Sequence, residues 1–209
     1  MKIIRFIFLL VFISSITACS DNKPKLKALS KSATILAFGD SLTYGTGASQ
    51  VDSYPSRLKQ LIGFKVVNAG VSGEVSSDGK KRLGKLLDKH KPALVVLCHG
   101  GNDLLQKLDT SQTIDNLKAM IKMIKDSGAE VILLSVPKPG LMLKPAPFYE
   151  AIAEETKTPI ILGLISEILS NRTLKSDTAH PNAKGYSEIA KSIADLLIER
   201  DAVSSLKQG

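Results

Sequence analysis

The sequence has no tryptophan, and only 5% of its 209 residues are aromatic. A hydrophobic core of this composition must be built mainly from Leu, Ile, Val and Ala side chains. The formal net charge is +8, but the basic residues are not interleaved with aromatic ones as they are in nucleic-acid-binding patches. We therefore expect no nucleic-acid partner. There is no internal repeat, and a chain of this length is typical of a single domain.

Cysteine is equally scarce, since Cys19 and Cys98 are the only two. Cys98 ends the apolar run of residues 94–98, and no neighbouring residue would favour its thiolate. We therefore interpret it as a buried core residue rather than a reactive thiol. If Cys19 is chemically modified, no internal disulfide can form.

The N-terminal segment has the pattern of a secretory signal. Lys2 and Arg5 accompany an apolar run over residues 3–16, which ends in Ile16-Thr17-Ala18-Cys19. The run is shorter than the about 20 apolar residues of a membrane-spanning helix. The triplet before Cys19 resembles the lipobox of bacterial lipoproteins. That resemblance implies a signal peptide over residues 1–18, lipidation of Cys19 and attachment to a membrane. An ordinary cleaved signal or an uncleaved anchor are the alternatives.

Residues 19–32 are polar and rich in lysine, without periodicity, and are predicted to form a lipidated linker. Its lysines would either lie against anionic headgroups or form a solvated tether. Ser20 stands where an inner-membrane retention signal would have Asp. If the organism has two membranes, this favours a cell-envelope lipoprotein in the outer membrane, facing the periplasm.

Apolar runs and helical patterns alternate along residues 33–200, the predicted domain, and residues 201–209 are predicted to be a C-terminal tail. The predicted strands are residues 34–38, 65–68, 93–98, 131–136 and 160–162. The predicted helices are residues 54–62, 79–90, 113–127, 148–157 and 183–199, and Gly128 is predicted to cap the third of them. Nearly continuous apolar strands separated by helices indicate a parallel sheet covered on both faces. The sequence therefore predicts a three-layer α/β/α fold with about five strands.

Open parallel sheets bind ligands at the carboxyl ends of their strands. Three predicted strands end there in loops rich in Gly and small polar residues, at 39–43, 68–74 and 100–103. Ser41 directly follows the first strand and is a plausible nucleophile, but a serine hydroxyl needs an adjacent base.

The search for that base is short because the chain has three histidines. His90 ends a Lys-rich helix and is expected to face solvent. His99 follows the third strand and would either shape the pocket or serve the structure. His180 follows Asp177 by three residues, a spacing that lets the carboxylate hold one imidazole nitrogen and leaves the other for a serine proton. The chain order Ser41, Asp177, His180 is one known solution to that geometry.

An acyl-transfer site also needs hydrogen-bond donors for the oxyanion of the tetrahedral intermediate. The candidates are the backbone N–H groups of Ser41 and Gly73 and the side-chain amide of Asn102. Taken singly, Gly73 is also compatible with a simple turn and Asn102 with a loop cap.

Four ordered blocks, Gly39-Asp40-Ser41-Leu42, Gly73, Gly100-Gly101-Asn102-Asp103 and Asp177-x-x-His180, resemble those of SGNH (GDSL) hydrolases over residues 33–200. The resemblance implies a flavodoxin-like sheet, Ser41 as nucleophile, Gly73 and Asn102 as oxyanion donors, His180 as base, and neither metal nor cofactor. Within the family the chain looks like the bacterial arylesterase, thioesterase I and lysophospholipase group. Gln106-Lys107 and Thr178-Ala179 depart from that group's usual residues.

These residues predict a serine esterase that hydrolyses carboxylic esters or thioesters, with lipidic or aryl acyl esters as the leading substrates. A carbohydrate or peptidoglycan O-acetyl esterase is the alternative enzyme, and a catalytically silent envelope-binding lipoprotein is the alternative of another class. Residues 137–147 would either line an acyl pocket or pack on the domain surface. We expect a monomer.

Overall fold

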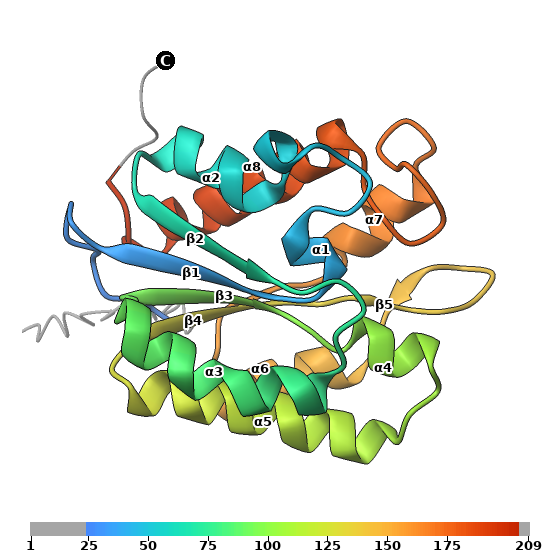
Figure 1. Ribbon diagram of the computed structural model, residues 1–209, viewed down its shortest axis with the longest axis horizontal. Helices are drawn as coiled ribbons and strands as arrows, with labels where there is room; N and C mark the ends of the chain where they lie inside the picture. The colour runs from blue at the N-terminus through green and yellow to red at the C-terminus, as the bar shows by residue number, and fades with distance from the viewer. Residues whose placement is uncertain (1–23, 205–209) are drawn as a thin grey trace, which may run out of the picture.

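The structure, a computed structural model, describes residues 24–204. Five parallel strands form one sheet in the order β2-β1-β3-β4-β7 (Figure 1). Their bounds are β1 Thr34–Gly39, β2 Lys65–Gly70, β3 Leu94–Cys98, β4 Glu130–Leu134 and β7 Ile160–Ile161. Every residue of β3 is buried, as expected of a central strand covered on both faces.

Helices cover both faces of the sheet, which confirms the predicted three-layer arrangement (Figure 1). On one side lie α2 Tyr54–Ile62, α7 Leu164–Ser170 and α8 Ala183–Glu199; on the other lie α3 Ser76–His90, α5 Thr110–Asp126 and α6 Phe148–Thr156. Strand order reverses beside β1, because β2 and β3 flank it on opposite sides. The loops that follow these three strands therefore meet at one edge, which we call the carboxyl edge.

Several short elements at the carboxyl edge were not predicted. They are the helices α1 Ser41–Tyr44 and α4 Gly101–Leu105, the 3₁₀ turn η1 Gln50–Asp52, and the antiparallel hairpin of β5 Pro137–Lys138 and β6 Lys144–Pro145. The helix α7 was also missed. Each has too few residues to establish a hydrophobic period, so tertiary contacts rather than local pattern decide its conformation.

The third predicted helix begins earlier than expected. Asp109 caps α5 by accepting hydrogen bonds from the N–H groups of Ser111 and Gln112, so the helix begins at Thr110, three residues before the predicted start. The residues of that first turn are exposed and polar and show no apolar periodicity, so the sequence pattern did not predict the turn. Gly128 follows the helix with φ +86°, the conformation expected just beyond a helix end.

The packed unit is longer than the predicted domain of residues 33–200. Leu26, Ala202 and Val203 belong to the hydrophobic core, and Leu29 N–H donates to the Ala202 carbonyl at 2.8 Å. The predicted linker therefore packs on the domain from Leu26 onward, because its leucines find an apolar surface beside the C-terminal residues. The predicted signal peptide and Cys19 lie outside the described residues. Within the described residues, no helix has the length and apolar character needed to cross a bilayer.

Candidate active site

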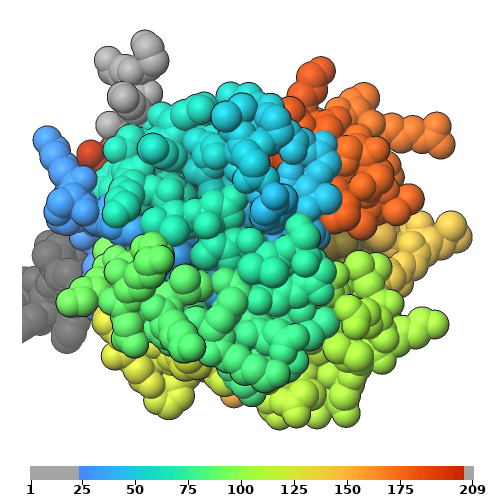
Figure 2. Space-filling model, viewed as in Figure 1, coloured from blue at the N-terminus to red at the C-terminus, as the bar shows by residue number. Residues whose placement is uncertain are grey.

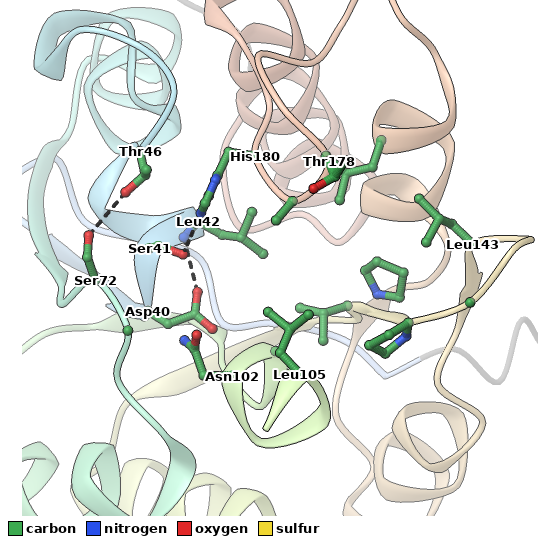
Figure 3. Close-up of a pocket in the computed structure, with 18 residues that line it drawn as sticks. Asp40, Ser41, Leu42, Thr46, Ser72, Asn102, Leu105, Leu143, Thr178 and His180 are labelled. Carbon is green, nitrogen blue, oxygen red and sulfur yellow. Dashed lines mark hydrogen bonds between the residues drawn. The ribbon is translucent and has the colours of Figure 1, made fainter. Parts of the chain in front are cut away.

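Ser41 lies at the first position of α1, immediately after β1 (Figure 3). The Asp40 side chain caps this helix by accepting a hydrogen bond from Leu42 N–H at 3.0 Å. In the sheet, Gly39 stands level with Gly70 of β2 and Cys98 of β3, so the three loops start at the same height. A side chain at Gly39 would meet the Cys98 carbonyl oxygen at 2.0 Å. Only glycine allows the strands to approach so closely here.

His180 faces Ser41 although 139 residues separate them along the chain. Its Nε2 lies 3.1 Å from Ser41 Oγ, and its Nδ1 lies 2.9 Å from Asp177 Oδ2. An ionised carboxylate only accepts hydrogen bonds, so Nδ1 carries the proton and Nε2 is free to accept the serine proton. The structure thus brings together the three residues predicted as nucleophile, base and orienting acid.

The Asp177 carboxylate is held by its own turn. It accepts hydrogen bonds from the N–H groups of Ala179 at 2.7 Å and His180 at 2.9 Å. Partial burial raises the pKa of Asp177, but the hydrogen bonds from Ala179 and His180 outweigh this and hold the pKa below its usual value. Asp177 therefore stays ionised and can hold the imidazole in one orientation.

Asn182 holds the loop that carries Asp177 and His180, a role that sequence reasoning missed. Its side-chain amide donates to the carbonyl groups of Thr173 and Lys175, while its oxygen accepts from Lys184 and Gly185 at the start of α8. One side chain therefore joins both ends of the loop to a long helix. An Asn before a predicted helix signals a cap, but its bonds back into the loop had no local signal.

The three predicted oxyanion donors, Ser41, Gly73 and Asn102, line one pocket (Figure 3). Gly73 has φ +80°, a conformation that favours glycine. Asn102 lies in the first turn of α4, and its side-chain Nδ2 donates one hydrogen bond to the Glu74 carbonyl at 3.0 Å. An amide nitrogen has two protons, so the second remains available for a ligand.

Glu74, Arg82 and His99 form a connected group behind these donors. Arg82 Nε and Nη2 donate to the two Glu74 carboxylate oxygens at 2.5 and 2.6 Å, and His99 Nε2 lies 3.0 Å from Glu74 Oε2. Gly100 N–H donates to His99 Nδ1, so the proton of the neutral ring is on Nε2 and points at Glu74. His99 is fully buried and does not line the pocket. Of the two roles considered for it, shaping the pocket or supporting the structure, it has the second.

Arg82 also joins the ends of two strands. Its Nη2 donates to the carbonyl groups of Gly39 at 3.2 Å and Ala69 at 2.9 Å, and its guanidinium stacks 4.2 Å from the Phe38 ring centre. Burial raises the pKa of Glu74, but hydrogen bonds from His99 and Arg82 and the Arg82 charge hold the pKa below its usual value. The sequence singled out neither Glu74 nor Arg82, since their pairing depends on the fold.

The pocket beside Ser41 has a volume of about 480 Å³. Its walls away from Ser41 are mainly apolar and come from Leu42, Leu105, Val136, Pro137, Pro139, Leu143 and Leu169. Three of these belong to residues 137–147, so this segment lines the pocket rather than only packing on the surface. Leu105 and Leu143 lie on the opposite side of the pocket from Thr46 and Ser72 (Figure 3). Among the described residues, no group of three or more His, Cys, Asp or Glu side chains could hold a metal ion.

Comparison with known proteins identifies a family and a fold. The model of the GDSL-like Lipase/Acylhydrolase family matches residues 37–187. The chain is 32% identical to the thioesterase 1/protease 1/lysophospholipase L1 of Escherichia coli K12, over 78% of this chain and 83% of that protein. It is 29% identical to an arylesterase of Vibrio mimicus, over 80% of this chain and 90% of that protein. The crystal structure of TesA superposes with a TM-score of 0.71 at 27% identity, covering 80% of this chain and 99% of that one.

Proposed function

The chain belongs to the GDSL-like lipase/acylhydrolase family and is an ester hydrolase, and we propose that it works through an acyl enzyme formed on Ser41. The observation that carries this proposal is the hydrogen-bond line from Asp177 through His180 to Ser41, which ends at an apolar pocket. A serine hydroxyl is a weak nucleophile until such a base accepts its proton.

In the first half of the reaction, Ser41 Oγ forms a bond to the ester carbonyl carbon as its proton passes to His180 Nε2. Asp177 accepts the Nδ1 hydrogen bond and stabilises the imidazolium that forms. The negative charge on the former carbonyl oxygen is met by the Ser41 and Gly73 N–H groups and the Asn102 amide. Preorganised donors of this kind supply much of the rate enhancement in acyl transfer.

The intermediate then collapses, and the alcohol or thiol leaves with the proton held on His180 Nε2. Water enters, gives a proton to the same nitrogen and attacks the acyl-Ser41 carbonyl carbon. The second tetrahedral intermediate collapses by breaking the bond between the acyl carbon and Ser41 Oγ, which takes back the proton from His180 Nε2 as the carboxylic acid leaves. Apart from the substrate and water, the steps use Ser41, His180, Asp177 and the three proposed oxyanion donors.

We infer that the substrates are lipidic or aryl acyl esters, with thioesters also cleaved. The apolar pocket wall supports an acyl group with an alkyl chain, because burial of methylene groups favours binding by about 0.8 kcal/mol each. The names of the relatives, arylesterase and thioesterase 1/protease 1/lysophospholipase L1, support the same substrate range. Acetylated carbohydrate would leave most of this wall unoccupied.

We also propose that Cys19 is lipidated and that the enzyme is an outer-membrane lipoprotein facing the periplasm. The basic start, the short apolar run and the Ile16-Thr17-Ala18-Cys19 sequence support this. Mass spectrometry of the protein purified from its host should show an acylated N-terminal Cys19. A Cys19→Ser variant should lose the added mass. A wild-type protein whose N-terminus is unmodified would contradict the proposal.

Activity should be tested on nitrophenyl esters from acetyl to palmitoyl, using the chain from Ser20 to Gly209. Every residue of the described core lies between Leu26 and Val203, so this chain retains the whole core. We expect a preference for medium or long acyl chains. Ser41→Ala should lower kcat by about 10³-fold or more, and Asp177→Asn should also lower kcat strongly because it loses the anionic partner of His180.

Ser187→Ala is the matched control, since Ser187 is an exposed serine on α8 that does not line the pocket. Its activity should equal that of the wild type. Activity confined to acetyl esters would replace our substrate assignment with an O-acetyl esterase. A protein that hydrolyses no ester and never reacts with a fluorophosphonate probe at Ser41 would instead support a binding lipoprotein.

A further inference from the structure

Large apolar side chains are exposed at only one edge of the described molecule. They are Tyr44, Val51, Val71, Leu105, Leu108, Leu141, Met142 and Leu162. Each belongs to a loop or short element that follows the carboxyl end of β1, β2, β3, β4 or β7. Single exposed apolar residues are normal on a protein surface. All eight here lie in loops or short elements of the carboxyl edge, and two of them, Leu141 and Met142, are adjacent; contiguous exposed apolar patches mark interaction sites.

The hairpin of β5 and β6 is the most prominent part of this edge. It projects beyond the sheet in Figure 1, and its yellow atoms stand out from the surface in Figure 2. The tip side chains of Leu141 and Met142 have relative exposures of 104% and 71%. Their neighbours Gly140 and Leu143 line the catalytic pocket. The same hairpin therefore lines the pocket with Gly140 and Leu143 and exposes the apolar side chains of Leu141 and Met142 to solvent.

Positive charge surrounds the apolar tip. Lys138 and Lys144 flank it on the two strands of the hairpin, and Lys107 and Arg172 are exposed in neighbouring loops of the carboxyl edge. The acidic groups of the same loops are already engaged, whereas Glu150 and Glu167, in the first turns of α6 and α7, are exposed. Asp40 and Asp103 are buried, and Asp109 caps α5. Asp52 pairs with Arg57, Glu74 with Arg82, and Asp177 with His180.

We propose that the carboxyl edge docks on an anionic lipid surface, with Leu141 and Met142 inserted at the headgroup level and the lysines against the headgroups. Apolar tips with flanking cations suit such an interface, since apolar burial and charge attraction add. Docking would bring the acyl ester of a membrane amphiphile directly to the pocket mouth. The inference deepens the proposed function and rests on it for the substrate, but surface binding itself requires no hydrolysis. It requires no Cys19 anchor and is tested without one; residues 24–33 join the domain at the opposite edge.

Binding should be measured by co-sedimentation with vesicles of phosphatidylcholine, with and without phosphatidylglycerol. The protein is the chain from Ser20 to Gly209 carrying Ser41→Ala, so that no lipid is hydrolysed. Adding Leu141→Ser and Met142→Ser should lower the partition coefficient about tenfold on both vesicle types. Adding Lys138→Gln and Lys144→Gln should lower it roughly twenty-five-fold, and only on vesicles with phosphatidylglycerol, since each lysine near such a surface contributes about 1 kcal/mol.

Lys59→Gln with Lys89→Gln is the matched control, because it removes the same charge from exposed positions near the ends of α2 and α3, away from the carboxyl edge. This control should bind the anionic vesicles like its parent protein. Equal losses in control and hairpin variants, or no loss in the hairpin variants, would overturn the docking proposal. A concentration-dependent dimer in ultracentrifugation that Leu141→Ser and Met142→Ser abolish would overturn it too, and would place a second copy on the patch.

The same hairpin variants with Ser41 intact should hydrolyse a soluble acetyl ester at the wild-type rate. Weakened vesicle binding with unchanged hydrolysis would support docking and the proposed enzyme together. Normal hydrolysis with unaltered vesicle binding would overturn docking alone. Hairpin-dependent vesicle binding in a protein that hydrolyses no ester would support docking and refute the proposed enzyme.

Discussion

The guanidinium of Arg82 holds the carboxylate of Glu74 through two hydrogen bonds, beside Gly73 in the loop that follows β2. Glu74 follows Gly73, and its carbonyl accepts the hydrogen bond that orients the Asn102 amide. Because Arg82 also bonds to the carbonyl groups of Gly39 and Ala69, one side chain ties the ends of β1 and β2 to the loop between Gly70 and Ser76. The pair therefore positions the groups that we propose as oxyanion donors, without lining the pocket with its own side chains.

Glu74→Gln should accordingly impair turnover more than binding. Glutamine keeps the shape but leaves the partly buried Arg82 without its anionic partner, so the loop that carries Gly73 loses its restraint. Loss of a whole oxyanion donor costs about 10² to 10³ in kcat, and we expect a displaced donor to cost about tenfold. Steady-state kinetics should show this fall in kcat with little change in KM.

Asp126→Asn is a suitable comparison, since it removes an exposed carboxylate paired with Lys122 on α5. Such surface pairs contribute about 0 to 1 kcal/mol to stability and should leave the kinetics unchanged. Unchanged kcat in Glu74→Gln would show that the Arg82–Glu74 pair supports the fold alone.

Asp40 should make stability depend on pH in the acid range. Burial raises the pKa of Asp40 above its ordinary value of 3.8, although His99 and the Leu42 N–H oppose the rise. The folded state therefore binds this proton more tightly than the unfolded chain does, and its contribution to stability falls as pH rises from 3.8 through the folded pKa. Asp40→Asn keeps the helix cap but cannot ionise.

Denaturant unfolding of the wild type and Asp40→Asn at pH 3 and at pH 7 measures this effect. Relative to the wild type, the free energy of unfolding of the variant should be higher at pH 7 than at pH 3. A difference that does not change with pH would mean that burial of Asp40 carries no net cost of ionisation.

Cys98 should be inert in the folded protein. Burial raises the pKa of its thiol well above the ordinary value, and the nearby Asp40 carboxylate raises it further. In the chain from Ser20 to Gly209 it is the only thiol, so iodoacetamide labelling reports on it alone. Labelling in buffer should be about 10³-fold or more slower than in denaturant, because it requires opening of the core. Ser187→Cys, which adds an exposed thiol, should be labelled rapidly at the new site.

Leu26 should stabilise the domain even though it precedes the first strand. Its side chain is 7% exposed and belongs to the main core. Leu26→Ala should lower the free energy of unfolding by about 2 kcal/mol or more, as for other buried leucines. Lys25→Ala changes an exposed neighbour and should stay within about 0.5 kcal/mol of the wild type. Equal stability of the two variants in denaturant unfolding would mean that the segment does not pack on the domain in solution.

Much of the fold follows from local pattern. Continuous apolar runs such as residues 94–98 predicted strands, and the spacing of apolar residues predicted α2 and α8 with their observed ends. The short elements α1, α4 and α7 escaped prediction because fewer than about two turns carry no measurable period. The candidate site was predictable in its members, since Ser41, Asp177 and His180 stand in ordered motifs. Its supports were not, because Arg82 and Asn182 act through bonds to distant backbone groups.

The sequence by itself thus determined the order of the five strands of the main sheet and of the five longest helices, the sheet class, and the residues that we propose perform acyl transfer. Hydrophobic period and motif spacing act within a few residues, so they can be read along the chain. The tertiary structure alone decided that Glu74 meets Arg82 and His99, that Leu26 enters the core, and that exposed apolar side chains gather at the carboxyl edge. These features depend on the packing of segments far apart in the chain, for which no local periodicity exists.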